Sequence, residues 1–172
     1  MSELFGKDMS EHVMKSNIMK DDFGWEVPYE LVPIPSRGII YDPNTDLYGL
    51  ESVQIKAMTA KEEDILASQA LLKEGSVVTH LIKSSVVNAA FNPSDMISGD
   101  RNALMVSIRI TGYGPEYPYS VACQNCNYKN KQTARLDELP IKRLSINPIE
   151  SGKNEFEYSL PVTKKKVTFK FL

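Results

Sequence analysis

The stretch "ESVQIKAMTAKEEDIL", residues 51–66, contains the change of hydrophobic period that decides the fold class. In its first half, Val53 and Ile55 alternate with polar residues, which predicts a half-buried strand. The alternation then stops, and Thr59 precedes Glu62 by three residues. This is the spacing of a capping box, in which the carboxylate accepts a hydrogen bond from the N–H of the capping residue. We therefore expect a strand that leads directly into a helix, within an α+β fold.

The first turn of this predicted helix is acidic. Glu62, Glu63 and Asp64 follow one another there, where the helix dipole favours negative charge. Paired catalytic carboxylates are the alternative interpretation, but no His, Cys or glycine loop accompanies the cluster. We interpret these residues as capping and solvated side chains, and we expect Gly75 to end the helix.

The residues before this strand predict an arm and a set of turns. Residues 1–30 are polar and Met-rich, without the spacing of a helix, and are predicted to form an N-terminal arm. Prolines and glycines crowd the next stretch, which favours extended segments joined by turns. Within it, "GIIY" (38–41) is the expected hairpin partner of the strand in residues 51–58.

Two further helices complete a predicted three-helix core. Residues 76–91 place an apolar stripe at helical spacing, which core packing explains. A third helix is expected to begin with Ser98 or Asp100 as its cap and to end at Gly112 and Gly114. Residues 31–116 therefore form a mixed hairpin and helical core.

The last part of the chain, residues 117–172, is predicted to be β-rich. "CQNC" (123–126) forms the turn of one hairpin, a CxxC-tipped β-hairpin. Residues 156–160 and 167–171 alternate in the second, C-terminal β-hairpin. A two-stranded hairpin is marginally stable in water, so we expect this second one to pack on the core or on another subunit.

Cys123 and Cys126 are the only two cysteines and are spaced like half of a structural zinc site, which has four ligands. Three interpretations stay open: a free thiol pair in a tight turn, a half-site that a second chain completes, and a site completed within the chain by His, Asp or water. Asn127 tolerates the left-handed backbone conformation that a zinc knuckle needs after its second cysteine. We expect no cofactor other than this possible zinc ion.

The chain lacks the sequence patterns of common enzymes, such as a glycine-rich phosphate loop, G-x-S-x-G or H-E-x-x-H. A nucleophilic Cys123 would need His12 or His80 as its base. Gln124 and Asn125 between the cysteines, followed by a Lys-rich strand, argue against a redox motif of the thioredoxin type. We predict that the protein is not an enzyme and has no small-molecule substrate.

Charge is divided unevenly along the chain. Residues 1–116 carry 10 Lys+Arg against 17 Asp+Glu, a net −7, whereas residues 117–172 carry 10 against 5, a net +5, and the sum is −2. The excess of positive charge predicts contact with an acidic partner or a solvated face, and the overall pI near 5.8 makes nucleic acid a less favoured ligand. The candidate partner-binding residues are Lys129, Lys131, Lys142, Arg143, Lys164, Lys165 and Lys166.

The chain also lacks the marks of membrane insertion or export. No run approaches the 18 or so apolar residues of a membrane span, and the first residues lack the order of a signal peptide. We therefore expect no membrane span, a cytoplasmic product and reduced thiols.

Several short words follow one another along the chain: "VPIPSRGIIY", "VQIKAMTAKEEDIL", "MISGDRNALMVSIRITGYGPEY", "CQNC" and "FEYSLPVTKKKVTFKF". In this order they resemble the baseplate hub protein family of T-even-type contractile-tailed bacteriophages. Each of these motifs is common by itself, but the ordered set is specific and spans residues 31–172.

The resemblance implies a structural or assembly protein of the tail baseplate hub. Such a protein contacts other hub and tail proteins, first in the host cytoplasm during assembly and then in the virion baseplate. A zinc-dependent or basic-patch nucleic-acid-binding adaptor is the alternative. No catalytic role attaches to the matching positions, which are Ser36, Arg37 and Gly38; Met58 to Leu66; Gly99, Asp100 and Arg101; Cys123 and Cys126; and Leu160, Pro161, Val167 and Phe169.

Overall fold

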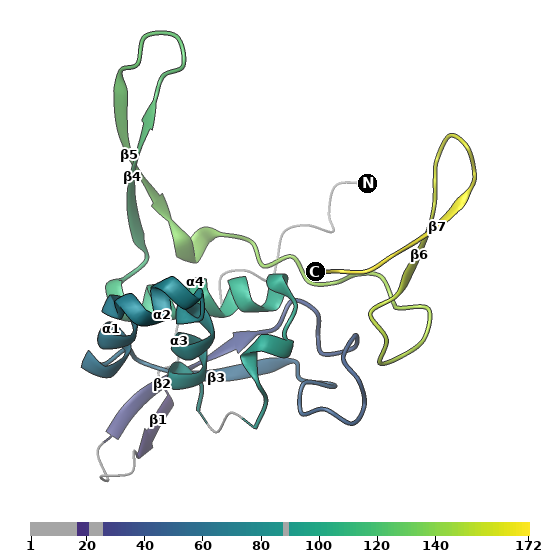
Figure 1. Ribbon diagram of the computed structural model, residues 1–172, viewed down its shortest axis with the longest axis horizontal. Helices are drawn as coiled ribbons and strands as arrows, with labels where there is room; N and C mark the ends of the chain where they lie inside the picture. Colours follow the sequence, from purple (N-terminus) through teal and green to yellow (C-terminus); the bar gives the residue numbers. More distant parts are fainter. Residues whose placement is uncertain (1–16, 21–25, 88–89) are drawn as a thin grey trace.

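The structure is a computed structural model that describes residues 17–20, 26–87 and 90–172. It confirms the predicted α+β class: a body built from a small antiparallel sheet covered by helices, with two hairpins that extend from it (Figure 1). The sheet has the order β1-β2-β3. Its strands are β1 (Asn17–Lys20), β2 (Glu26–Pro33) and β3 (Ser52–Lys56).

The helices follow β3 along the chain and lie against the sheet (Figure 1). The hairpins β4–β5 and β6–β7 stand at the left and right of the figure, far apart from each other. The helices are α1 (Ala60–Ala67), α2 (Gln69–Glu74), α3 (Val77–Ser85), the 3-10 turn η1 (Pro93–Asp95) and α4 (Ser98–Tyr113). The remaining elements are β4 (Glu116–Ala122), β5 (Lys129–Arg135), the 3-10 turn η2 (Leu136–Glu138), β6 (Phe156–Ser159) and β7 (Lys166–Phe169).

The predicted pairing of β3 is wrong. Its partner is β2, with Val32 opposite Val53 and Glu30 opposite Ile55, whereas residues 38–41 lie in turns. The two prolines of β2 are compatible with this pairing, because Pro33 is its last residue and Pro28 lies outside the segment that faces β3. Part of the predicted arm therefore belongs to the sheet, while residues 1–16 and 21–25 lie outside the described residues.

The first predicted helix is divided in two at Ser68. This residue is extended, its N–H donates to the Ile65 carbonyl, and its hydroxyl accepts a hydrogen bond from the N–H of Leu71. A serine that caps the following turn competes with continuation of the helix. Gly75 ends the second part in the left-handed conformation, as predicted.

The other two helices differ from prediction at their ends. Helix α3 stops at Ser85, because Val86 is extended and bridges Ile55 of β3. Helix α4 has Ile97 as its N-terminal cap, so the prediction of Ser98 or Asp100 as the cap is wrong. The carboxylate of Asp100 is instead used inside the body.

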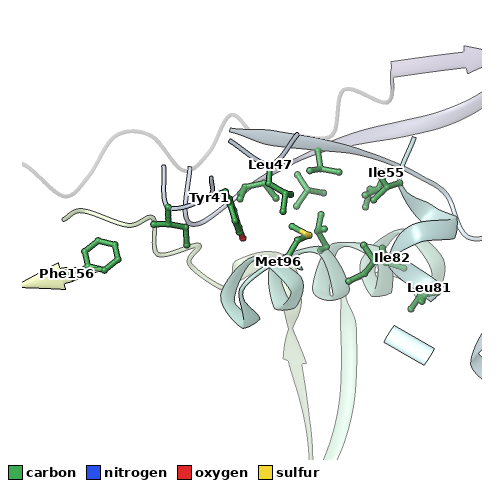
Figure 2. Packing of buried hydrophobic residues seen from close by; sticks show 14 residues of the cluster. Tyr41, Leu47, Ile55, Leu81, Ile82, Met96 and Phe156 are labelled. Atoms are coloured by element: carbon green, nitrogen blue, oxygen red, sulfur yellow. The ribbon is translucent and has the colours of Figure 1, made fainter. Parts of the chain in front are cut away.

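The core lies between the β2–β3 face of the sheet and helices α3 and α4. Ile55 and Ile82 lie at one end of the cluster, Tyr41 and Leu47 farther along it, and Phe156 at the far end (Figure 2). The turns of residues 34–50 and the C-terminal hairpin therefore share one core with the sheet and helices. Removal of this apolar surface from water is the main driving force for folding of the body.

Candidate functional site

A buried hydrogen-bond network joins two segments that are far apart in the sequence. Asp100, at the start of α4, accepts hydrogen bonds from the Ser36 N–H (2.9 Å), the Ser36 hydroxyl and the Tyr41 hydroxyl. The Tyr41 oxygen also accepts from the Ile97 N–H, at 3.1 Å. Burial and the adjacent Asp100 carboxylate raise the pKa of Tyr41. The network ties the "PSRG" turn to the "GDR" helix start, which explains the residue types in both words.

The turn after Ser36 requires unusual backbone conformations. Arg37 and Gly38 both have positive φ, at 58° and 69°. A Cβ atom on Gly38 would lie 2.3 Å from the Leu50 nitrogen, so no larger residue fits there without a backbone shift. The Gly38 N–H donates to the Ser36 hydroxyl at 3.1 Å, which fixes that hydroxyl for its bond to Asp100.

Glu62 forms a second buried network at the start of α1. The predicted capping box with Thr59 is present, and the Thr59 N–H donates to the carboxylate at 2.9 Å. The Ser84 hydroxyl of α3 also donates to it, and Lys56 of β3 lies 3.3 Å away. Glu62 is fully buried, so solvation, which we predicted for the acidic cluster, is wrong for this residue. It joins β3, α1 and α3.

Hydrogen bonds decide the charge state of Glu62. Burial by itself would raise the pKa of this carboxyl group. The hydrogen bonds from Ser84 and Thr59, together with the positive charge of Lys56, outweigh burial and lower the pKa to about 2. Asp100 and Glu62 therefore each connect separate elements of the body.

The β4–β5 hairpin differs from the body because both of its faces are exposed. All residues of β4 and all but Ala134 of β5 are exposed, and the hairpin points away from the helices (Figure 1). The pairing puts Tyr117, Tyr119 and Val121 on one face. The opposite face carries Glu116, Pro118, Ser120 and Ala122 on β4 and Lys129, Lys131, Thr133 and Arg135 on β5.

Arg109 holds the base of this hairpin to helix α4. Its guanidinium group donates to the carbonyl oxygens of Gly114 (3.0 Å) and Glu116 (3.3 Å). It also lies 4.8 Å from the ring centroid of Tyr113 and 6.0 Å from that of Tyr117, within the range of cation–π attraction. The hairpin is therefore presented in a defined direction by the end of α4.

The predicted CxxC turn joins β4 to β5. Cys123 is half-buried, Cys126 is exposed, and both thiols are free. Asn127 has a φ of 56°, the left-handed conformation that we expected of it. Among the residues that the structure describes, no three or more His, Cys, Asp or Glu side chains gather in a way that could hold a metal ion.

The β6–β7 hairpin is bound to the body by one end. Phe156 and Phe169 stack with their ring centroids 5.6 Å apart, and Phe171 meets both edge-on. The amide of Asn154 exchanges two hydrogen bonds with the backbone of Phe171. Phe156 belongs to the core cluster and Phe169 packs against it, so the hairpin packs on the core, which is one of the two expected outcomes, with Tyr158 left exposed.

A groove of about 410 Å³ crosses the body between β2, α4 and the segment after η2. Its walls include the exposed side chains of Leu31, Leu139 and Ile141. Glu30 also lines it, and one of its carboxylate oxygens is buried without a hydrogen-bond partner in the described part of the chain. Burial raises the pKa of Glu30. A molecule that placed an N–H or O–H donor against this oxygen would offset the cost of desolvation.

The sequence model of a protein family described as T4 bacteriophage base plate protein matches residues 39–171. This range includes both hairpins and all helices of the body. The chain belongs to this family. Asp100 and the capping box lie within the residues that match the T4 base plate family, and Ser36 lies just before them. No curated protein and no solved structure matches the chain.

The structure separates the candidate partner-binding residues of this base plate protein into three places. Lys129 and Lys131 extend from one face of the β4–β5 hairpin. Lys142 and Arg143 lie in the segment after η2, where Arg143 lines a hollow with Arg37 and Glu51. The remaining group lies in or beside the β6–β7 turn, where Lys166 pairs with Glu157 at 2.8 Å; it comprises Lys164, Lys165 and Lys166.

Some residues of the candidate site were not singled out from the sequence. The apolar row of Tyr117, Tyr119 and Val121 was visible as an alternating pattern, but the pattern alone does not tell an exposed face from a buried one. Glu30 and Arg109 carried no local signal, because their roles depend on elements that meet only in the fold. No helix within residues 17–20, 26–87 and 90–172 is long and apolar enough to cross a membrane.

Proposed function

We propose that this base plate protein is a component of the baseplate hub, or a factor in its assembly, and that it acts through contacts with neighbouring baseplate and tail proteins rather than by catalysis. It meets these partners in the host cytoplasm during assembly and takes its place in the tail baseplate of the virion. Family membership supports the baseplate role. The β4–β5 hairpin supports the contact role.

The exposed apolar face of the hairpin carries the proposal. A two-stranded hairpin has little stability of its own in water, and this one has Tyr117, Tyr119 and Val121 side by side without cover from the body. Tyrosines are enriched where protein surfaces meet, because the ring supplies apolar area and the hydroxyl a hydrogen bond. A partner surface that covers this row would stabilise both the hairpin and the complex.

The test uses the full-length, affinity-tagged protein in phage-infected cells. The double variant Tyr119→Ser/Val121→Ser removes the centre of the apolar row. We expect it to recover about tenfold less of the co-purifying baseplate proteins than the unmodified chain, as identified by mass spectrometry. Recovery of these proteins at the unmodified level would overturn the assignment of this face.

Leu72→Ser is a matched control for this variant. Leu72 lies on α2 of the body and is 51% exposed, against 52% for Val121. Leu72→Ser therefore matches the Val121→Ser change in exposed fraction, at a different place on the molecule. The control is expected to recover baseplate proteins at the unmodified level. An equal loss in both variants would indicate general surface hydrophobicity and not a specific face.

A nucleic-acid-binding adaptor is the second candidate, favoured by the exposed lysines on the opposite face of the hairpin. Lys129 and Lys131 are neighbours on this face, and Thr133 separates Lys131 from Arg135. Arg135 is already paired with Asp137 and Glu138, which reduces the free positive charge. Binding of the purified protein to DNA or RNA that weakens steeply with salt would favour this candidate. We expect no such binding.

A further inference from the structure

The tip of the β4–β5 hairpin is a closed turn with both cysteines on it. The Cys123 N–H donates to the Tyr128 carbonyl at 2.9 Å, and the Asn127 N–H donates to the Cys123 carbonyl at 2.8 Å. Asn127 takes the left-handed conformation that lets the chain reverse there. These contacts hold the two cysteines in one short loop, two residues apart, at the far end of the hairpin (Figure 1).

Both cysteines of this turn are available as metal ligands. The thiolate, and not the thiol, is the form that binds zinc. Neither cysteine is consumed in a disulfide.

The turn itself supplies only half of the ligands for such a site. Structural zinc sites are tetrahedral and closed by four protein ligands, commonly four cysteines. In residues 17–20, 26–87 and 90–172 no third metal-binding side chain joins the pair. The other ligands must come from elsewhere if the turn holds a metal.

We propose that two copies of this chain bring their Cys123–Cys126 turns together and hold one Zn²⁺ ion between them through four thiolates. A twofold arrangement provides the missing ligands without any new residue type, because each copy contributes the same pair. The hairpin makes this geometrically accessible, since its tip points away from the body (Figure 1).

The charges beside the turn agree with the shared site. Four thiolates exceed the charge of one Zn²⁺ ion, so the site has a net negative charge. Lys129 and Lys131 follow the turn on β5 and stay exposed. Two copies would place these ammonium groups near the site, where they offset its charge. The inference rests on the proposed function, since it names one contact that the hairpin makes.

The test measures metal uptake and mass on the same sample of full-length, reduced protein. Co²⁺ is added first, because tetrahedral thiolate coordination gives it sulfur-to-metal charge-transfer and visible absorption bands, and Zn²⁺ then displaces it. Sedimentation follows the molecular mass. We expect saturation at about one metal ion per two chains, together with conversion of monomer to dimer that a chelator reverses.

Cys123→Ser and Cys126→Ser are each expected to abolish both the cobalt bands and the dimer. Asn125→Ala, between the cysteines, keeps both ligands and is the matched control, with metal uptake within about twofold of the unmodified chain. Circular dichroism and thermal unfolding would show that the body is intact in all three variants, because the turn makes no contact with the core.

Two results would overturn the inference. Absence of cobalt bands at millimolar metal means that the turn is a bare thiol pair, and one metal per chain in a monomeric protein means that a single chain completes the site. Either result leaves the proposed function standing if Tyr119→Ser/Val121→Ser still loses baseplate proteins. Conversely, a metal-linked dimer with unchanged recovery would reject only the apolar face as the partner surface.

Discussion

The body and the β4–β5 hairpin differ in whether their polar and apolar side chains find partners within the chain. In the body, the carboxylates of Asp100 and Glu62 are fully buried, and each accepts hydrogen bonds from a distant segment of the chain. In the hairpin, an apolar row and a lysine row lie on opposite faces, and both are exposed beyond the contact of Arg109 with the hairpin base. The body is therefore held together by contacts among its own buried side chains, whereas the hairpin leaves most of its side chains exposed.

The side chains of the two regions contribute differently to the free energy of unfolding. A buried carboxylate without its donors costs several kcal/mol, so residues that surround Asp100 are under strong stability constraints. Exposed side chains on a hairpin change stability little when substituted. Substitutions in the two regions should therefore have opposite consequences, large for stability in the body and large for assembly in the hairpin.

The largest expected effect is that of Asp100→Ala. The change leaves the Ser36 N–H and the Tyr41 hydroxyl buried without an acceptor, which is expected to cost about 4 kcal/mol in free energy of unfolding. Urea unfolding followed by circular dichroism measures it. If the variant does not fold, Tyr41→Phe removes the hydrogen bond to Asp100 and the one accepted from the Ile97 N–H, at a cost of about 2 kcal/mol.

Asp95→Ala is the control for this change. Asp95 is exposed in η1, and its loss is expected to alter the free energy of unfolding by less than about 0.5 kcal/mol. If Asp100→Ala and Asp95→Ala change the free energy of unfolding by similar amounts, the buried network does not stabilise the body.

Gly38→Ala is expected to cause the next largest loss in free energy of unfolding. Its Cβ would meet the Leu50 nitrogen at 2.3 Å, and its φ is positive, so we expect a loss of about 3 kcal/mol. Gly49→Ala has the same φ of 69° but open space around the new atom, and is expected to cost about 1 kcal/mol. Thermal and urea unfolding of both variants separate the steric cost from the backbone cost. Equal losses would argue that the tight "PSRG" turn can relax.

Acid should weaken the body through Glu62. The pKa of this group is about 2 in the folded protein, below its ordinary value of 4.5, so the unfolded chain binds the proton first as pH falls. Its stabilising contribution is complete above about pH 5 and is lost between there and pH 2, for up to about 3 kcal/mol. Unfolding curves of the unmodified chain and Glu62→Gln at a series of pH values measure it.

The gap in stability between these two proteins should narrow as the pH falls. Glu63→Gln, an exposed neighbour on the same turn, serves as the control and should follow the unmodified chain throughout. Parallel curves for Glu62→Gln and the unmodified chain from pH 7 to pH 3 would show that Glu62 titrates normally in the fold.

The smallest effect on stability is expected from the hairpin. Tyr119→Ser/Val121→Ser should lower the free energy of unfolding of the body by less than about 1 kcal/mol, because neither side chain is buried. Urea unfolding of the variant checks this. A loss as large as that of Gly38→Ala would mean that the hairpin is part of the folding unit, and the contrast between the two regions would fail.

Much of the local structure was predictable from short-range patterns. The strand–helix boundary at Thr59, the helix end at Gly75 and the turn at "CQNC" follow from residue types that act on their immediate neighbours. The pairing of β3 was not predictable in this way. Residues 38–41 are closer to β3 in the sequence and also place Ile40 and Tyr41 in the core, but they do so from turns, and β2 pairs with β3 across the longer connection.

The candidate site was likewise predictable only in part. The cysteine pair, the lysines and the alternation of Tyr117, Tyr119 and Val121 could all be read from the sequence. Their grouping could not, because charges that are close in the sequence, such as Lys131 and Lys142, lie on different elements of the fold.

By itself, the sequence determined the class of the fold, the family resemblance, the capping box at Thr59, the turns at Gly75 and "CQNC", and the row of side chains on each strand. These depend on backbone preferences and on periodicity, which act over a few residues. Only the tertiary structure decided that Asp100 meets Ser36 and Tyr41, that Glu62 is buried, and that the β4–β5 hairpin stands free. Those outcomes depend on which elements cover one another, and burial is a property of the packed chain as a whole.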